Sequence, residues 1–256
     1  MGDAIHVTER GDSGPVVVLV HGTAMPGRLS WAAQKPLAER YRLWIVDRRG
    51  YGDSPPVKRR EDFEVDAQDL LDTVPHGAHL VGISYGSIGA LIAAATEPQR
   101  FASLTLIECP AFILAPGDAD AMNAMNRLDA LHADTTLDDH AWFERFLEVI
   151  GAPRGLPKPL PSPFDRTVPI TRGHRRSWEQ DLPLDGIAAA RLPVLVITSG
   201  EHPAFEAVAD HLTAVLDARH ERIGGYGHLV PLAPQFNAVL DDFFSSITPA
   251  QGAVAS

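Results

Sequence analysis

A serine with a glycine two residues away on each side constrains this chain more than any other feature. It lies in the stretch 82–86, Gly-Ile-Ser-Tyr-Gly, after an apolar segment (78–81) that predicts a strand and before an alanine-rich segment (87–95) that predicts a helix. A G-x-S-x-G sequence between a strand and a helix indicates a nucleophile elbow, a sharp turn that exposes the serine side chain. We expect roughly 1–3 kcal/mol of backbone strain at Ser84.

Strand and helix patterns alternate through the first 110 residues. They favour the elbow over a glycine-rich turn with an incidental serine, which arises by chance in many sequences. The β-branched run 16–20 is typical of a strand buried on both faces of a parallel sheet, and 42–46 and 102–107 are further strands. The alternation predicts an α/β protein with a doubly wound, mostly parallel sheet. Also expected here are a strand over 4–8, a helix over 31–40 and an amphipathic helix over 66–74.

The alternation stops after Pro110. Apolar residues at helical spacing predict one helix through Met122 and Leu131 and a second through Phe143 and Ile150. Thr136, with Asp139 three residues later, is a capping-box variant that would start the second helix. A proline-rich stretch follows, and then a short helix over 172–180.

We interpret residues 111–185 as a helical lid inserted after the strand that follows the elbow helix. This insertion leaves from the carboxyl edge of the sheet, where the elbow also opens. The alternative is a second small domain unrelated to catalysis. The α/β core would then comprise 1–110 and 186–248, and 249–256 would be a flexible tail. The returning core elements are strands over 193–198 and 218–223 and helices over 204–216 and 234–245.

Composition and charge exclude several classes of protein. A net charge of −11 over 256 residues argues against a nucleic-acid or anionic-membrane surface. The short basic run 58–60 is followed by Glu61 and Asp62, so we expect a solvated loop there. The single cysteine, Cys109, excludes an internal disulfide and fits a reducing cytosol. No signal peptide or membrane-spanning run is visible, so the sequence predicts a cytoplasmic protein.

No cofactor or metal ion is expected. The sequence has no G-x-x-x-x-G-K-[ST] or strand-linked G-x-G-x-x-G to hold a phosphate. It also has no H-E-x-x-H motif and no cluster of cysteines and histidines. The expected partner is a small-molecule substrate, and a homodimer is compatible with the sequence.

A serine hydroxyl is a weak nucleophile near neutral pH and needs a base, for which His228 is the candidate. This histidine follows the last expected strand, in a glycine-flanked loop. Together with residues 21–23 (His-Gly-Thr), the loop 47–54 (Asp-Arg-Arg-Gly-Tyr-Gly-Asp-Ser) and the elbow, it completes four motifs in one order. In these motifs the sequence resembles lid-bearing enzymes of the α/β-hydrolase fold, over most of the chain except the insertion and the tail. The resemblance implies that Ser84 is the nucleophile and His228 its base.

The same resemblance implies an oxyanion hole built from two backbone N–H groups. One belongs to Tyr85, directly after the serine, and the other to Thr23, after His21 and Gly22. Loss of one such donor typically costs about 2.7–4 kcal/mol of transition-state stabilisation. The side chain of Tyr85 has an alternative role as a wall of the pocket. Asp47 is expected to bond backbone amides in its own loop.

The acid of the triad departs from the usual pattern of this family. Most members carry an aspartate in the loop after the penultimate strand, and that position here is Pro203. Some related members place the acid at the end of the strand after the elbow helix, where this chain has Glu108. We therefore expect Glu108 to orient the histidine, with Glu201 as the runner-up. Glu206 and Asp210, in an expected helix, are weaker alternatives.

The expected function is serine hydrolysis of an ester, lactone or thioester bond in a small, mostly apolar substrate. It would proceed through a Ser-His-acid triad and an acyl-enzyme, with the lid shaping the pocket and excluding water. C–C bond hydrolysis, a lyase reaction and a perhydrolase reaction are alternatives on the same triad. Because the usual aspartate is missing, a second function is also compatible with the sequence: a hydrolase-fold protein that binds a ligand with little turnover.

Overall fold

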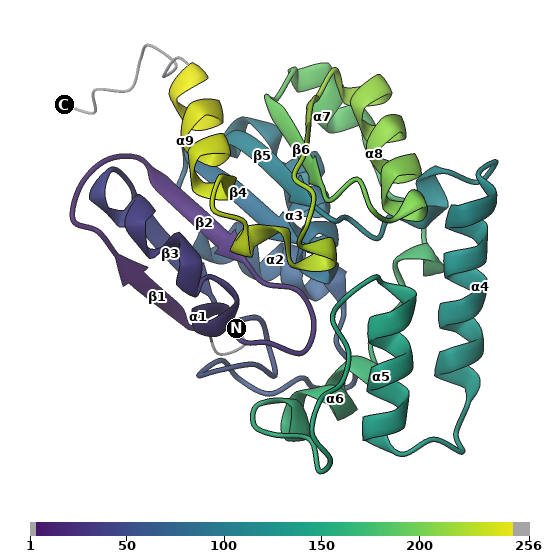
Figure 1. The fold of residues 1–256 in the computed structure, drawn as a ribbon. Coiled ribbons are helices and arrows are strands. Elements are labelled where there is room, and N and C mark those ends of the chain that lie inside the picture. Colours follow the sequence, from purple (N-terminus) through teal and green to yellow (C-terminus); the bar gives the residue numbers. More distant parts are fainter. Residues whose placement is uncertain (1–3, 248–256) are drawn as a thin grey trace.

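A seven-stranded sheet forms the centre of the molecule, and helices cover both of its faces (Figure 1). The computed structural model describes residues 4–247, so the tail expected at 249–256 lies outside the described residues. The strand order is β1-β3-β2-β4-β5-β6-β7. β1 is antiparallel to β3, and the other described pairings are parallel. The doubly wound α/β sheet is thereby confirmed.

The elements have the following bounds. The strands are β1 (Val7–Arg10), β2 (Val16–Val20), β3 (Arg42–Val46), β4 (Ala78–Ile83), β5 (Phe101–Ile107), β6 (Val194–Thr198) and β7 (Arg219–Arg222). The α-helices are α1 (Gly27–Ser30), α2 (Phe63–Thr73), α3 (Tyr85–Thr96), α4 (Ala119–Ala133), α5 (Asp139–Val149), α6 (Phe164–Arg172), α7 (Asp185–Ala190), α8 (Pro203–Leu216) and α9 (Phe236–Ser246). Short 3₁₀ helices are η1 (Ala32–Glu39), η2 (Pro98–Arg100), η3 (Phe112–Leu114), η4 (Ser177–Glu179) and η5 (Gly227–Leu232).

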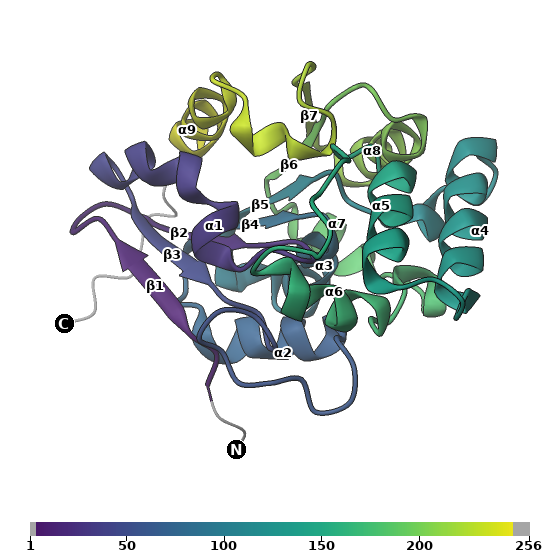
Figure 2. The same cartoon turned by 60° about the horizontal axis from the view of Figure 1, so that its bottom comes forward.

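The sheet separates two apolar clusters, which explains the continuous apolar run of β2. Successive side chains of a strand point to opposite faces. Val18 and Val20 belong to the cluster that contains α2 and α3, whereas Val17 and Leu19 belong to the cluster that contains η1 and α9. All five residues of β2 are therefore buried. Figure 2 shows α2 and α9 on opposite sides of the sheet.

Two expected elements are present with a different type or different bounds, and a third is absent. The expected helix over 31–40 is the 3₁₀ helix η1, because Pro36 lies inside it and lacks the N–H that an α-helix needs. The expected strand over 4–8 is β1, which begins only at Val7. The expected helix over 172–180 is absent: the structure has α6 before it, ending at Arg172, and only the single turn η4 within it.

The segment between β5 and β6 contains α4, α5 and α6, which lie beside one end of the sheet (Figure 1). α4 packs against α8 and α5, and the side chains of both α4 and α5 join the cluster on the α3 face. Asp138, rather than Thr136, caps α5 by accepting a hydrogen bond from the Ala141 N–H at 2.8 Å. The Thr136 hydroxyl instead donates to Asp134. In the described part of the chain, no helix has the length and apolar character needed to cross a bilayer.

His79 couples the stability of the sheet to pH. This β4 residue is buried, with Nδ1 2.8 Å from Ser103 Oγ and its ring stacked 4.5 Å from that of Phe244. Burial lowers the pKa of His79 to about 4. An unfolded histidine has a pKa near 6.5, so the unfolded chain takes up the proton first as the pH falls. The stability that neutral His79 contributes is present above pH 6.5 and is lost as the pH falls toward 4.

We predict that the His79→Gln variant loses less stability on acidification than the unsubstituted protein. Between pH 7 and pH 5, the free energy of unfolding of the unsubstituted protein should fall by about 2 kcal/mol more than that of the variant. Urea unfolding at both pH values measures the difference. Equal falls in the two proteins would show that His79 does not carry this pH dependence.

Candidate active site

Three polar side chains from distant parts of the chain meet at the carboxyl edge of the sheet. Ser84 follows β4, Glu108 follows β5, and His228 lies in η5 after β7. Nε2 of His228 lies 2.9 Å from Oγ of Ser84, and Nδ1 of His228 lies 3.4 Å from Oε2 of Glu108. The imidazole therefore has the hydroxyl on one side and the carboxylate on the other.

Ser84 occupies a sharp turn between β4 and α3. Its backbone angles, φ 50° and ψ −131°, lie in a region that residues other than glycine rarely adopt. Ser84 is also the N-cap residue of α3. A Cβ on Gly86 would lie 2.2 Å from the His21 carbonyl oxygen, and a Cβ on Gly22 would lie 2.9 Å from Cβ of Ser84. The glycines thus allow the loop after β2 to pass directly against the turn.

Glu108 is held by the backbone of the neighbouring strand. The residue is fully buried and has a φ of 44°. Its N–H donates to the Ile197 carbonyl at 3.0 Å, and its Oε1 accepts a hydrogen bond from the Ser199 N–H at 2.5 Å. With one carboxylate oxygen fixed by the backbone, the other oxygen faces His228. A carboxylate at Nδ1 favours the tautomer that leaves Nε2 free to accept a proton from Ser84.

The other three candidate acids are engaged elsewhere. A carboxylate oxygen of Glu201 accepts a hydrogen bond from the Gly225 N–H, in the loop that leads to His228. Glu206 forms an ion pair with Arg222 at 2.5 Å, and Asp210 lies 3.5 Å from the same guanidinium. Among the described residues, Glu108 is the acid that reaches the imidazole. Glu201 shapes the histidine loop without touching the ring.

His228 is also supported by the end of α5. Its N–H donates to the Gly151 carbonyl at 3.3 Å. Gly227 has a φ of 50°, and a Cβ there would lie 2.7 Å from the same carbonyl oxygen. The ring packs on the Phe205 ring of α8, with 5.1 Å between centroids. Backbone and ring contacts therefore both restrict the imidazole.

The two expected oxyanion donors lie on either side of Ser84 in the fold. Tyr85 is the first residue of α3, so its N–H has no acceptor within the helix. Thr23 lines the same cavity as Ser84, and its N–H has no acceptor among the described residues. The Tyr85 hydroxyl donates to the Arg175 carbonyl at 2.9 Å, and its ring is absent from the cavity lining. The alternative of Tyr85 as a pocket wall is therefore wrong.

A cavity of about 330 Å³ opens at Ser84. One wall is α5 with the segment that follows it, and the other is the loop after β2 and the His228 loop. Among the described residues, no Asp, Glu, Lys or Arg lines it. The wall from the inserted segment comprises Phe143, Phe146, Leu147, Ile150, Ala152, Pro153, Leu156 and Phe164. At the rim, Leu29, Leu229 and Leu232 are 51%, 39% and 52% exposed.

Buried charges that the sequence analysis missed lie directly behind this site. Arg48 and Glu61 are almost fully buried and pair at 2.5 Å, and Arg48 also pairs with Asp66 at 2.8 Å. The basic run 58–60 lies in an exposed loop, as the sequence predicts, but Glu61 directly after it is buried. Its position next to a basic run suggested solvent, whereas the fold brings it to an arginine thirteen residues earlier in the sequence.

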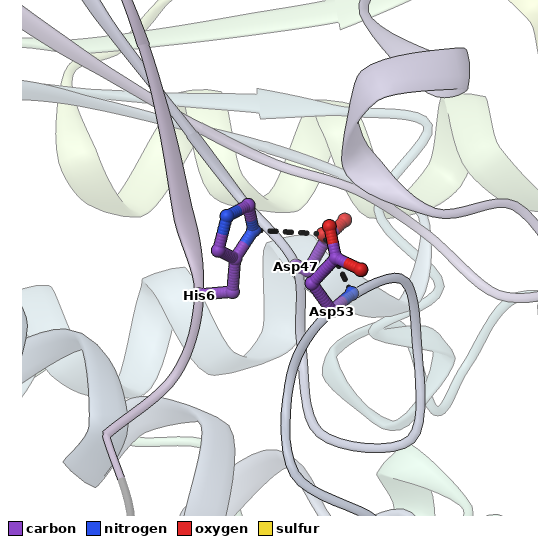
Figure 3. A group of neighbouring side chains, drawn as sticks. All are labelled: His6, Asp47 and Asp53. Carbon is purple, nitrogen blue, oxygen red and sulfur yellow. Dashed lines mark hydrogen bonds and ion pairs between the residues drawn. The ribbon is translucent and has the colours of Figure 1, made fainter.

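His6, Asp47 and Asp53 could each offer a ligand atom to a metal ion, within 4.8 Å of one another (Figure 3). Hydrogen bonds already use both carboxylate oxygens of Asp47. One accepts from the Gly27 N–H at 2.8 Å, and the other accepts from the Asp53 N–H at 3.2 Å and faces Nδ1 of His6. We infer that these hydrogen bonds stabilise the loop after β3.

The sheet order, the strained serine turn and the histidine loop after the last strand together define the α/β-hydrolase fold. The sequence model of the alpha/beta hydrolase family matches residues 17–238. The chain belongs to this family. A solved alpha/beta hydrolase from Sphaerobacter thermophilus has a similar fold, with a TM-score of 0.69 at 24% identity over 94% of this chain and 96% of that one.

Curated relatives match parts of the chain. The pimeloyl-[acyl-carrier protein] methyl ester esterase of Methylococcus capsulatus is 38% identical over 130 residues, which is 49% of this chain and 50% of the relative. The protein of the same name from Aliivibrio salmonicida is 30% identical over 174 residues, which is 62% of this chain and 65% of the relative. The chain thus spans about half the length of the first relative and less than two thirds of the second.

The packing at the serine turn predicts that Gly86→Ala destabilises the protein. The new methyl group would meet the His21 carbonyl at 2.2 Å, and backbone cannot move aside cheaply, so we expect a loss of about 2 kcal/mol or more. Gly117→Ala is the matched control, because nothing lies within 4 Å of its Cβ position. Urea unfolding should place the control within about 0.5 kcal/mol of the unsubstituted protein. Equal stabilities of the two variants would contradict the close approach.

Proposed function

We propose that the protein hydrolyses an ester-like bond through the triad Ser84, His228 and Glu108. The observation that carries the proposal is the 2.9 Å contact between His228 Nε2 and Ser84 Oγ, with Glu108 behind the ring. A nucleophile, a base and an orienting acid in this relation are the parts that acyl transfer to a serine requires.

In the proposed reaction, His228 takes the proton of Ser84 as Oγ attacks the carbonyl carbon of the substrate. The N–H groups of Thr23 and Tyr85 stabilise the negative oxygen of the tetrahedral intermediate. The protonated histidine then donates to the leaving alcohol or thiol, which leaves an acyl group on Ser84. A water molecule, activated by the same histidine, attacks this acyl-enzyme and releases the acid. Glu108 keeps the imidazole in the required tautomer throughout.

The cavity supports an uncharged, mostly apolar substrate. Its wall carries phenylalanines and aliphatic side chains, and burying a fixed charge among them would be costly without a partner. The name of the curated relatives, pimeloyl-[acyl-carrier protein] methyl ester esterase, agrees with the cleavage of an ester. We therefore propose esters of short to medium chains as the substrate class. Lactones, thioesters and C–C bonds adjacent to a carbonyl belong in the same test panel.

We also propose that residues 111–185 act as a lid and that 1–110 and 186–248 form the core. The support is that this segment supplies one whole wall of the cavity, through α5 and the chain up to Phe164. Met122 and Met125 of α4 do not line the cavity. A small-molecule partner, a cytoplasmic location and a homodimer remain predictions from the sequence.

Ser84→Ala should abolish turnover of p-nitrophenyl butyrate, with a fall in kcat of at least about 10⁴-fold. The variant should unfold at the same urea concentration as the unsubstituted protein, because the turn keeps its backbone. A fluorophosphonate probe should label the unsubstituted protein stoichiometrically and leave the variant unlabelled. Retained turnover in Ser84→Ala would end the proposal, and a folded protein that is neither active nor labelled would favour a binding protein.

Glu108→Gln tests the third member of the triad. The amide keeps the shape of the side chain but favours the wrong imidazole tautomer, so kcat should fall by about 10³–10⁴-fold. Glu201→Gln is the matched control, because it makes the same chemical change at a residue that bonds the loop leading to His228, and it should keep kcat within about tenfold. A collapse of the rate in Glu201→Gln alone would move the acid to that residue.

A further inference from the structure

Arg48 bonds the backbone of residues 21–23, the loop after β2 that carries the proposed oxyanion donor Thr23, and we call this segment the oxyanion loop. Its side chain is 1% exposed. Nε donates to the His21 carbonyl at 2.9 Å, and Nη2 donates to the Gly22 carbonyl at 2.7 Å. The backbone N–H of Arg48 donates to Nε2 of His21 at 3.0 Å. One residue thus makes three hydrogen bonds to two consecutive residues of the loop.

The acceptor role of His21 Nε2 settles the tautomer of this histidine. A backbone amide can only donate, so Nε2 carries no proton and Nδ1 carries one. That Nδ1–H lies 2.7 Å from the Gly22 carbonyl oxygen and donates to it. Complete burial, followed by the charge of Arg48, lowers the pKa of His21 well below its ordinary value. The ring therefore stays neutral, and the Gly22 carbonyl has two fixed donors.

The Gly22 carbonyl and the Thr23 N–H belong to one planar trans peptide, in which they point in opposite directions. The donors from Arg48 and His21 hold the carbonyl toward the buried charges. The N–H of Thr23 must then point away from them, toward the cavity that Thr23 shares with Ser84. A Cβ at Gly22 would lie 3.5 Å from Ser84 Oγ, which shows how near this peptide lies to the nucleophile.

Two carboxylates neutralise the charge of the buried Arg48 guanidinium. Nη1 of Arg48 pairs with Glu61 at 2.5 Å and with Asp66 at 2.8 Å. Burial raises the pKa of Asp66 to about 6, while Arg48 opposes that rise. Arg48 also lies 5.1 Å from the ring centroid of Tyr85, whose N–H is the second proposed oxyanion donor. The same side chain therefore contacts the Tyr85 ring and the carbonyl of the Gly22–Thr23 peptide.

From these contacts we infer that Arg48 is a positioning residue of the oxyanion hole. It fixes the Gly22–Thr23 peptide so that the Thr23 N–H is aligned before substrate binds. The inference rests on the proposed ester hydrolysis. A donor that is already oriented needs no reorganisation during the reaction. The buried cluster of Arg48, Glu61 and Asp66 would therefore contribute to transition-state stabilisation.

Arg48→Lys separates this role from simple charge balance. The ammonium keeps a positive charge beside Glu61 and Asp66, but one nitrogen cannot replace a planar fork that reaches two carbonyls. We expect kcat for p-nitrophenyl butyrate to fall at least tenfold, with KM changed by less than about threefold. Complete loss of one donor costs 10²–10³ in kcat in other enzymes, and a misaligned donor should cost less.

The affinity for an alkyl trifluoromethyl ketone distinguishes a positioning role of Arg48 from a merely structural one. The ketone adds to Ser84 to form a tetrahedral oxyanion, so its affinity should fall by about the same factor as kcat. The pH profile of kcat/KM, which reports the triad, should keep its midpoint. Arg100→Lys is the matched control, because Nε and Nη2 of Arg100 also bind one backbone carbonyl, that of Val74. Its kinetic constants and ketone affinity should match those of the unsubstituted protein.

A folded Arg48→Lys variant with unchanged kcat overturns the inference, and so does a fall in kcat without a fall in ketone affinity. If Arg48→Lys does not fold, the triple variant Arg48→Met, Glu61→Gln, Asp66→Asn removes the three charges together and must meet the same expectations. If the unsubstituted protein neither hydrolyses esters nor labels at Ser84, the proposed function itself fails. The two failures are thus distinguishable.

Discussion

The close approach of two loops, one after β2 and one after β4, is the constraint on which the rest of this structure depends. Gly86 brings the start of α3 against the His21 carbonyl, and Gly22 brings the loop after β2 against Cβ of Ser84. The strained backbone of Ser84 persists because strands on both sides and the buried helix α3 hold it. The proposed nucleophile and oxyanion donors are therefore placed by backbone packing, which does not need the side chains of Thr23 and Tyr85.

The position of the acid follows from the geometry of the sheet. β5 lies between β4 and β6, so a glutamate directly after β5 stands next to the elbow and beneath the loop that carries His228. The longer side chain of Glu108 spans the remaining distance to the ring. The loop after β6, where the usual aspartate is replaced by Pro203, contributes the Ser199 N–H that holds Glu108.

The sequence predicted what depends on order along the chain. The elbow was recognisable from residue type and its place between a strand and a helix, and the family resemblance pointed to His228 and Glu108, which the structure brings together with Ser84. The buried pairing of Arg48 with Glu61 and Asp66 was not predictable in this way, because charged residues in loops are usually solvated and only the tertiary fold brings these three together. The prediction for the start of α5 was wrong for a local reason: Asp138 and Thr136 are both suitable cap residues, and the Thr136 hydroxyl bonds Asp134 instead.

One hydrogen bond joins the cavity wall formed by α5 and the following segment to His228, the proposed catalytic base. The Gly151 carbonyl, at the end of α5, accepts the N–H of His228, and the residues on either side of Gly151 line the cavity. The cavity wall and the proposed base therefore share one backbone support, so a change in the wall near Gly151 would also reach His228. Directed evolution toward bulkier acyl groups should begin at Leu29 of α1, on the opposite rim, where enlarging the pocket leaves the histidine loop undisturbed.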